Sequence, residues 1–167
     1  MILGMPEGLY TALHVIVSLI GIATGYLVAY GLVKGRILRG WTGVFLATTI
    51  LTSLSGFGFP AQKLLPSHVI GILSLIALGI AVLSLYTFQL RGGWRNAYVV
   101  TALISLYFNS FVAVVQAFLK SPTLHALAPT QKEPPFAAAQ LALLLAFITI
   151  TIVSLRRRVV MPGVSLS

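Results

Sequence analysis

The charged residues of this chain lie only in short segments between five long apolar runs. Eleven Lys or Arg residues and two Glu residues are the only charged side chains among the 167 residues. An ionised group at the centre of a bilayer costs about 3 kcal/mol or more. A sequence that keeps every charge outside its apolar runs is therefore typical of a protein that crosses a membrane several times.

The composition excludes most soluble classes of protein. Hydrophobic residues make up 58% of the chain and charged residues only 8%, whereas a soluble domain normally carries about 25% charged residues. The net charge is +9. Because the basic residues are scattered between apolar runs, as topology signals are, we expect no nucleic-acid binding. The absence of cysteine excludes disulfides and thiolate metal sites. We expect one membrane domain over residues 1–167 with the lipid bilayer as its surroundings.

The five runs have the length of membrane-spanning helices. They contain 18 to 24 residues each, and helices of that length reach about 27–36 Å, against a hydrocarbon core of about 30 Å. The runs cover residues 10–33, 42–59, 67–90, 97–119 and 136–155, with a long loop over 120–135. The sequence predicts an all-α bundle of five transmembrane helices.

The basic residues predict how this bundle is oriented. With five crossings, eight of the eleven Lys and Arg residues fall on one side of the membrane. The other three are Lys63, Lys120 and Lys132. Since basic residues are enriched in cytoplasmic segments, we expect the N-terminus outside and the C-terminus in the cytoplasm.

Three histidines on the predicted outer side are the main candidate ligands. His14 lies about 6 Å into the first run and His68 about 3 Å into the third, while His125 is in the long loop. One hypothesis is that His14 and His68 ligate a b-type haem. Another is that all three bind a metal ion such as copper or zinc. The alternative, which the sequence favours, is that each imidazole only hydrogen-bonds a carbonyl or a lipid headgroup.

Polar residues in the fourth and fifth runs extend this candidate site. Asn109 lies near the middle of the fourth run, where a buried amide needs a partner on another helix or a bound molecule. Gln116 and Gln140 lie at similar depth towards the outer side. Together with His14 and His68 they would form a polar ring suited to a quinone carbonyl or a haem propionate. Hydrogen bonding between helices is the simpler alternative for each residue.

Small residues suggest which runs pack together. Gly21 and Gly25 form a G-x-x-x-G stripe in the first run, and Gly71 and Gly79 give the third run a similar face. Such stripes let helix backbones approach closely in a membrane. We therefore expect a contact between the first and third runs, which would bring His14 and His68 together.

The chain lacks the residues of common enzyme classes. It contains no G-x-S-x-G, no Walker loop and no H-E-x-x-H. Its only carboxylates, Glu7 and Glu133, lie outside the apolar runs, so acid–base chemistry within the membrane has no carboxylate to use. The sequence therefore argues against an enzyme and against a proton-coupled transporter.

Three segments carry a resemblance to known proteins. They are TSLSGFGFP at 52–60, LPSHVIG at 65–71 and LHALAPTQ at 124–131. In these segments the chain resembles small bacterial inner-membrane proteins of unassigned function. The resemblance implies a multi-pass protein of a bacterial inner membrane, and it implies no activity or site.

Three functional hypotheses follow from these patterns. The first is a non-enzymatic membrane subunit or binding protein, which engages a lipophilic ligand, a partner membrane protein or a second copy of itself. The second is a small electron carrier with b-type haem on His14 and His68. The third is a minimal transporter for a neutral solute, with Asn109, Gln116 and Gln140 along its path, although no internal inverted repeat supports it.

Overall fold

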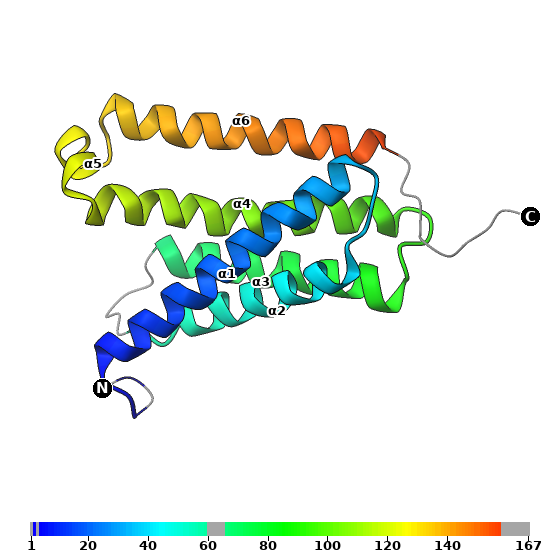
Figure 1. The fold of residues 1–167 in the computed structure, drawn as a ribbon, viewed down its shortest axis with the longest axis horizontal. Helices are drawn as coiled ribbons and strands as arrows, with labels where there is room; N and C mark the ends of the chain where they lie inside the picture. The colour runs from blue at the N-terminus through cyan, green and yellow to red at the C-terminus, as the bar shows by residue number, and fades with distance from the viewer. Residues whose placement is uncertain (1, 3, 60–65, 158–167) are drawn as a thin grey trace, which may run out of the picture.

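The computed structural model describes residue 2, residues 4–59 and residues 66–157 of the chain. Five long helices run along a common direction, and a short helix joins the last two of them (Figure 1). The helices are α1 (Glu7–Val33), α2 (Arg39–Gly56), α3 (Pro66–Val82), α4 (Trp94–Lys120), α5 (Pro122–Leu127) and α6 (Pro134–Arg156). A π-helical turn, η1 (Leu83–Thr87), extends α3. The predicted all-α fold is confirmed for these residues.

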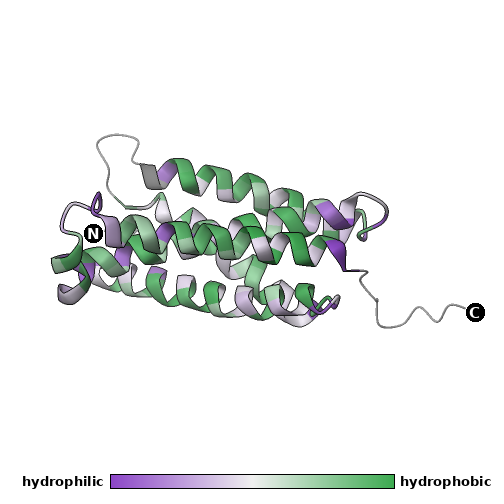
Figure 2. Ribbon diagram, turned by 90° about the horizontal axis from the view of Figure 1, so that it is seen from above, coloured by the Kyte–Doolittle hydropathy of each residue, from purple (hydrophilic) through white to green (hydrophobic). Residues whose placement is uncertain are grey.

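Four helical stretches are long and apolar enough to cross a membrane. They are α1, the stretch His68–Thr87, α4 and α6. Hydrophobic residues cover the middle of the helices, and hydrophilic residues gather at their two ends (Figure 2). Large apolar side chains face outward along these helices; Leu19 is 58% exposed and Leu145 is 54% exposed. This is the pattern of a multi-pass membrane protein, because lipid rather than water suits such a surface.

The two ends of the bundle differ in charge. The start of α1, the start of α3 and helix α5 lie at one end, which we call the α5 end (Figure 1). The turn from α1 to α2, the turn before α4 and the last turn of α6 lie at the other end, which we call the basic end. The basic residues described there are Lys34, Arg36, Arg39, Arg91, Arg95, Arg156 and Arg157.

The hydrophobic core lies nearer the basic end. In α1 only Tyr10 is buried before Gly21, whereas seven residues are buried from Gly21 onwards. In α4 six residues are buried up to Leu106 and only two after it. The main core contains Val28, Ala29, Leu32, Ile37, Phe45, Leu46, Leu78, Ala81, Leu90, Tyr98, Val99, Ala102, Leu103, Leu106 and Phe147. The helices are therefore packed tightly in one half of the bundle and loosely in the other.

The predicted contact between the first and third runs is wrong for the described residues, because α1 and α3 pack against other helices and not closely against each other. Helix α1 packs mainly against α2, and α3 packs against α2 and α4. A Cβ on Gly25 would overlap Leu106 and lie 2.9 Å from the Phe45 ring, so this glycine faces α2 and α4. A Cβ on Gly71 would lie 3.2 Å from the ring of Phe57, the residue that caps the end of α2. Gly25 thus permits close approach to α2 and α4, and Gly71 permits close approach to the end of α2, whereas nothing lies within 4 Å of a Cβ on Gly79.

Candidate functional site

A polar and aromatic cluster forms where α1 meets the last turn of α2. His14 follows Tyr10 by one helical turn, so both side chains lie on the same face of α1. The Nδ1 atom of His14 lies 2.7 Å from the hydroxyl oxygen of Ser55, and the Tyr10 hydroxyl donates to the Ser55 carbonyl over 2.6 Å. The Phe59 ring meets the rings of Tyr10 and His14 edge-on, each at a centroid distance of 5.2 Å. We call these four residues the His14 cluster.

A glycine in the chain after α2 allows this cluster to form. A Cβ at Gly58 would overlap the Tyr10 hydroxyl group. The phenol can therefore reach the Ser55 carbonyl only because residue 58 has no side chain. Tyr10 is buried, whereas His14, Ser55 and Phe59 are half-buried, so the imidazole is partly open to other molecules.

His68 also contacts the end of α2, through a different residue. Its ring stacks on Phe57 at a centroid distance of 5.5 Å, with an angle of 26° between the ring planes. The structure therefore brings His14 and His68 to neighbouring residues at the end of α2. It does so through Phe57 for His68 and through Ser55 and Phe59 for His14, and not through a contact between α1 and α3.

The other predicted polar residues lie elsewhere. Gln140 on α6 donates to the Phe111 carbonyl of α4 over 3.3 Å. Gln116 is exposed on α4, and His125 is exposed on α5. The four residues His14, His68, Gln116 and Gln140 therefore do not share one site as predicted. The two histidines lie at the end of α2, Gln140 contacts α4, and Gln116 is exposed.

The cofactor and metal hypotheses receive no specific support from this arrangement. In the part of the chain that the structure describes, no group of three His, Cys, Asp or Glu side chains is placed to hold a metal ion. His14, His68 and His125 all belong to that part. Haem on His14 and His68 stays a prediction from the sequence, as does a metal site that includes His125.

Asn109 lies close to Gly21 of α1 in the middle of the bundle. Its Nδ2 atom lies 3.4 Å from the position that a Cβ on Gly21 would occupy. The Thr49 hydroxyl oxygen of α2 lies 3.1 Å from the same position. Both atoms are buried without a hydrogen-bond partner in the described structure. The missing side chain of Gly21 therefore leaves room for polar groups of α2 and α4, which makes Asn109 part of the contact between three helices.

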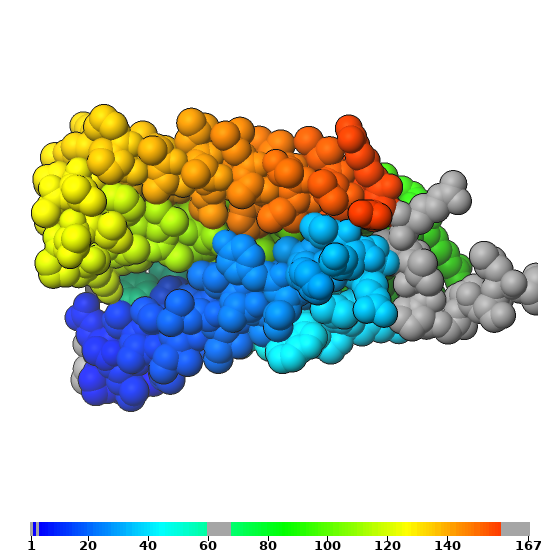
Figure 3. Space-filling model, turned by 45° about the horizontal axis from the view of Figure 1, so that its top comes forward, coloured from blue at the N-terminus to red at the C-terminus, as the bar shows by residue number. Residues whose placement is uncertain are grey.

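The surface is hollowed between α1 and α4 near the α5 end. Figure 3 shows α1 separating from α4 and α6 in this direction, with a hollow between α1 and α4. The burial pattern agrees, because the first half of α1 and the second half of α4 contribute few buried residues. We call this feature the α1–α4 hollow. His14 belongs to the half of α1 that borders it.

The sequence interpretation missed the partners of the two histidines. Tyr10, Ser55, Phe57 and Phe59 were not among the predicted site residues. The spacing of four between Tyr10 and His14 is a signal that could have found the first, since it places both on one face. Ser55 and the two phenylalanines carry no comparable signal, because their role depends on how α2 packs against its neighbours.

Comparison with protein-family models, curated proteins and solved structures finds no match to this chain. The resemblance to small bacterial inner-membrane proteins therefore stays a prediction.

Proposed function

We propose that the protein is a non-enzymatic subunit or binding protein of a bacterial inner membrane. In this proposal all five long helices cross the bilayer, with the N-terminus outside and the C-terminus in the cytoplasm. The α5 end then faces outward. The α1–α4 hollow receives the lipophilic part of a ligand or a helix of a partner protein, and the His14 cluster provides the polar contact.

The uneven packing of the helices is the observation that carries this proposal. Membrane helices associate through close van der Waals packing and small residues. This chain achieves such packing near the basic end, where Val28, Phe45 and Leu103 are almost completely buried. Nearer the α5 end α1 diverges from α4, and apolar side chains such as Leu13 and Ile16 stay exposed. A hollow open towards lipid suits an apolar molecule or a helix better than a dissolved solute.

The chemistry of the His14 cluster indicates what kind of ligand would fit. The Nδ1 atom of His14 is occupied by Ser55, and the ring's Nε2 atom is its second hydrogen-bonding position. Nε2 donates or accepts according to the tautomer, which the Ser55 hydroxyl helps to set. A lipophilic molecule with a carbonyl or hydroxyl group, such as a quinone, or a polar side chain of a partner helix, would supply the matching group.

The test is purification in mild detergent followed by identification of what remains bound. Extraction and mass spectrometry would detect a lipophilic molecule, and electrophoresis after cross-linking would detect a partner polypeptide. A hydrogen bond within a membrane contributes about 0.6–1.7 kcal/mol. We therefore expect His14→Leu to lower occupancy by about 3-fold to 20-fold.

A matched histidine provides the control for this experiment. His125 is exposed on α5, so His125→Leu should leave occupancy at the level of the unchanged protein. A protein that remains solitary and carries no bound molecule would contradict the proposal. Equal losses in both variants would also contradict it, because the effect would then not come from the His14 cluster.

A further inference from the structure

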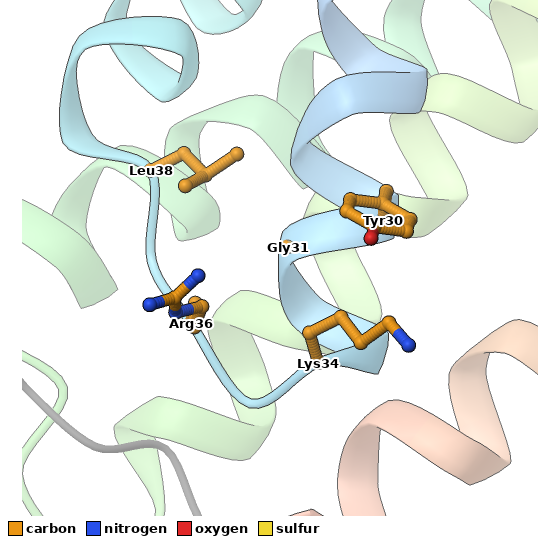
Figure 4. Close-up of a pocket in the computed structure, with 5 residues that line it drawn as sticks. All are labelled: Tyr30, Gly31, Lys34, Arg36 and Leu38. Carbon is orange, nitrogen blue, oxygen red and sulfur yellow. The ribbon is translucent and has the colours of Figure 1, made fainter.

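A second hollow lies at the basic end, between the last turn of α1 and the chain that returns to α2. It has a volume of about 310 Å³ and is lined by Tyr30, Gly31, Lys34, Arg36 and Leu38. Figure 4 shows Tyr30 and Lys34 on the side of the helix, with Arg36 and Leu38 on the returning segment. We call it the Lys34–Arg36 hollow. Small-molecule sites begin at about 300 Å³, so the hollow has room for a small polar group.

The backbone of the turn fixes the two cations around this hollow. The Arg36 N–H donates to the Gly31 carbonyl over 2.8 Å, and the Gly35 N–H donates to the Leu32 carbonyl over 3.0 Å. Gly35 has a φ of +71°, and this pair of bonds around a left-handed residue is the Schellman motif that ends many helices. A Cβ on Gly31 would lie 2.9 Å from Leu38, so the returning chain can approach only at a glycine. The turn therefore fixes the backbone of Lys34 and Arg36, and their exposed side chains extend from its two sides (Figure 4).

The chain cannot neutralise these cations with its own side chains. Lys34 and Arg36 are both exposed. The only side-chain carboxylates, Glu7 and Glu133, precede or begin helices at the α5 end, on the far side of the bundle. Lys34 lies over the Tyr30 ring, with its Nζ atom 5.7 Å from the ring centroid, a contact that leaves the positive charge in place. No side-chain carboxylate of the chain therefore competes with an anionic ligand for Lys34 and Arg36.

The hollow has the mixed character of a lipid interface. Tyr30, which is 63% exposed, and Leu38 give it apolar walls, and Lys34 and Arg36 give it positive charge. It lies at the end of α1, which is long and apolar enough to cross a membrane. In the proposed insertion this end lies where lipid headgroups begin. Basic pockets between transmembrane helices are typical sites for anionic headgroups.

We propose that the Lys34–Arg36 hollow binds the phosphate of an anionic phospholipid headgroup. Lys34 and Arg36 contact the phosphate oxygens from the two sides of the turn, and Tyr30 and Leu38 contact the glycerol and the upper acyl chain. This inference depends on insertion in a membrane and not on the ligand proposed for the α1–α4 hollow. The two proposals can therefore fail separately.

The test uses the full-length protein in lipid nanodiscs that contain phosphatidylcholine with about one fifth phosphatidylglycerol. The lipid that stays with the protein after transfer to detergent is measured by mass spectrometry, as the ratio of phosphatidylglycerol to phosphatidylcholine. A basic residue near an anionic surface changes binding by about fivefold. We therefore expect Lys34→Gln together with Arg36→Gln to lower the retained phosphatidylglycerol by about 30-fold.

Two matched variants make the outcome specific. Arg91→Gln with Arg156→Gln removes the same charge from the basic end outside the hollow, and it should retain phosphatidylglycerol. Lys34→Arg with Arg36→Lys keeps the charge and should restore most of the retention, even if the neutral pair proves unstable in detergent. Equal losses in both neutral pairs would overturn the proposal, because binding would then reflect the general charge of this end.

Inorganic phosphate distinguishes a lipid headgroup from a free anion. Millimolar phosphate should not displace phosphatidylglycerol if the acyl and glycerol contacts contribute as proposed. Complete displacement would overturn the assignment to a lipid and indicate a site for free phosphate. A retained lipid mixture equal to that of the nanodisc would show that no headgroup site exists.

Discussion

At the scale of single residues, Gly25 is the position where the packing of α1 depends most on the absence of a side chain. A Cβ there would overlap Leu106 and press on Phe45, both in the main core. Overpacking of this kind costs about 1–3 kcal/mol. We expect Gly25→Ala to lower the free energy of unfolding by that amount, measured by circular dichroism during denaturation in mixed micelles. Gly79→Ala is the control, because nothing lies within 4 Å of its added Cβ. Equal stability of the two variants would show that α1 does not pack as described.

Glu133, just before α6, is the residue whose ionisation is coupled to loop structure. Desolvation acts to raise the pKa of its carboxyl group, but hydrogen bonds from Thr130 and from the backbone of residues 130, 132 and 133 outweigh it and lower the pKa. The Thr130 hydroxyl donates over 2.8 Å and the Lys132 N–H over 3.0 Å. Because the folded pKa is lowered, these bonds stabilise the loop above the unfolded pKa. Their contribution is lost as the pH falls through the folded value.

Removal of the Thr130 hydroxyl tests this coupling. We expect Thr130→Val to raise the pKa of Glu133, since one hydrogen bond to the ionised form disappears. The measurement is an NMR titration of the Glu133 side-chain carboxyl carbon. Thr123→Val, at an exposed position of α5, should leave that pKa unchanged. An identical titration curve in the Thr130 variant would rule out the hydrogen bond from the Thr130 hydroxyl.

At the scale of helices, Arg95 at the start of α4 caps the end of α6. Its guanidinium donates to the carbonyl of Ser154 over 2.9 Å and to that of Leu155 over 3.4 Å, and it also contacts the Arg157 carbonyl. The last carbonyls of a helix have no partner within the helix, and a cation there is favoured by the helix dipole. The charged cap therefore ties the two helices together at the basic end.

Substitution of Arg95 should loosen the last turn of α6. We expect Arg95→Gln to lower the free energy of unfolding by about 1–2 kcal/mol and to speed amide hydrogen exchange in residues 153–156. Arg91→Gln removes a neighbouring exposed charge and should change neither quantity appreciably. If the amides of residues 153–156 exchanged at the same rate in the Arg95 variant and in the unchanged protein, the capping contact would be contradicted.

The helices themselves were largely predictable from the sequence, whereas their neighbours were not. Apolar runs and glycine or proline breaks give each of the five long helices to within a few residues, because lipid requires continuous backbone hydrogen bonding. The segment 120–135 is predicted as a loop, but it contains the short helix α5. A small-residue stripe such as Gly21 and Gly25 shows that a helix packs closely, but not against which helix. The partners of His14 and His68 therefore could not be derived, since Ser55 and Phe57 lie at the end of α2, which packs against both α1 and α3.

At the scale of the whole molecule, the number of crossings depends on α2. This helix has 18 residues. Of the five long helices, it alone is not counted among the four stretches that are long and apolar enough to cross a membrane. Its polar residues are turned towards other helices: Thr42 and Thr49 are almost completely buried, and Thr42 accepts a hydrogen bond from Tyr98. A helix enclosed on several sides needs fewer apolar residues than one surrounded by lipid. With about 27 Å of length, α2 runs between the same two ends as its neighbours (Figure 1).

The absence of cysteine allows a direct test of whether α2 crosses the membrane. Single cysteines are introduced as Gly8→Cys, Gly93→Cys and Thr130→Cys, and intact cells with a permeable outer membrane are treated with an impermeant thiol reagent. With five crossings, residues 8 and 130 lie on the same outer side, so both react. Residue 93 then reacts only after the inner membrane is opened. If α2 does not cross, residues 8 and 130 lie on opposite sides and only one of them reacts. That result would contradict the proposed orientation. It would also contradict the described bundle, because the turn after α1 and the turn before α4 would then lie on opposite sides of the membrane and not together at the basic end.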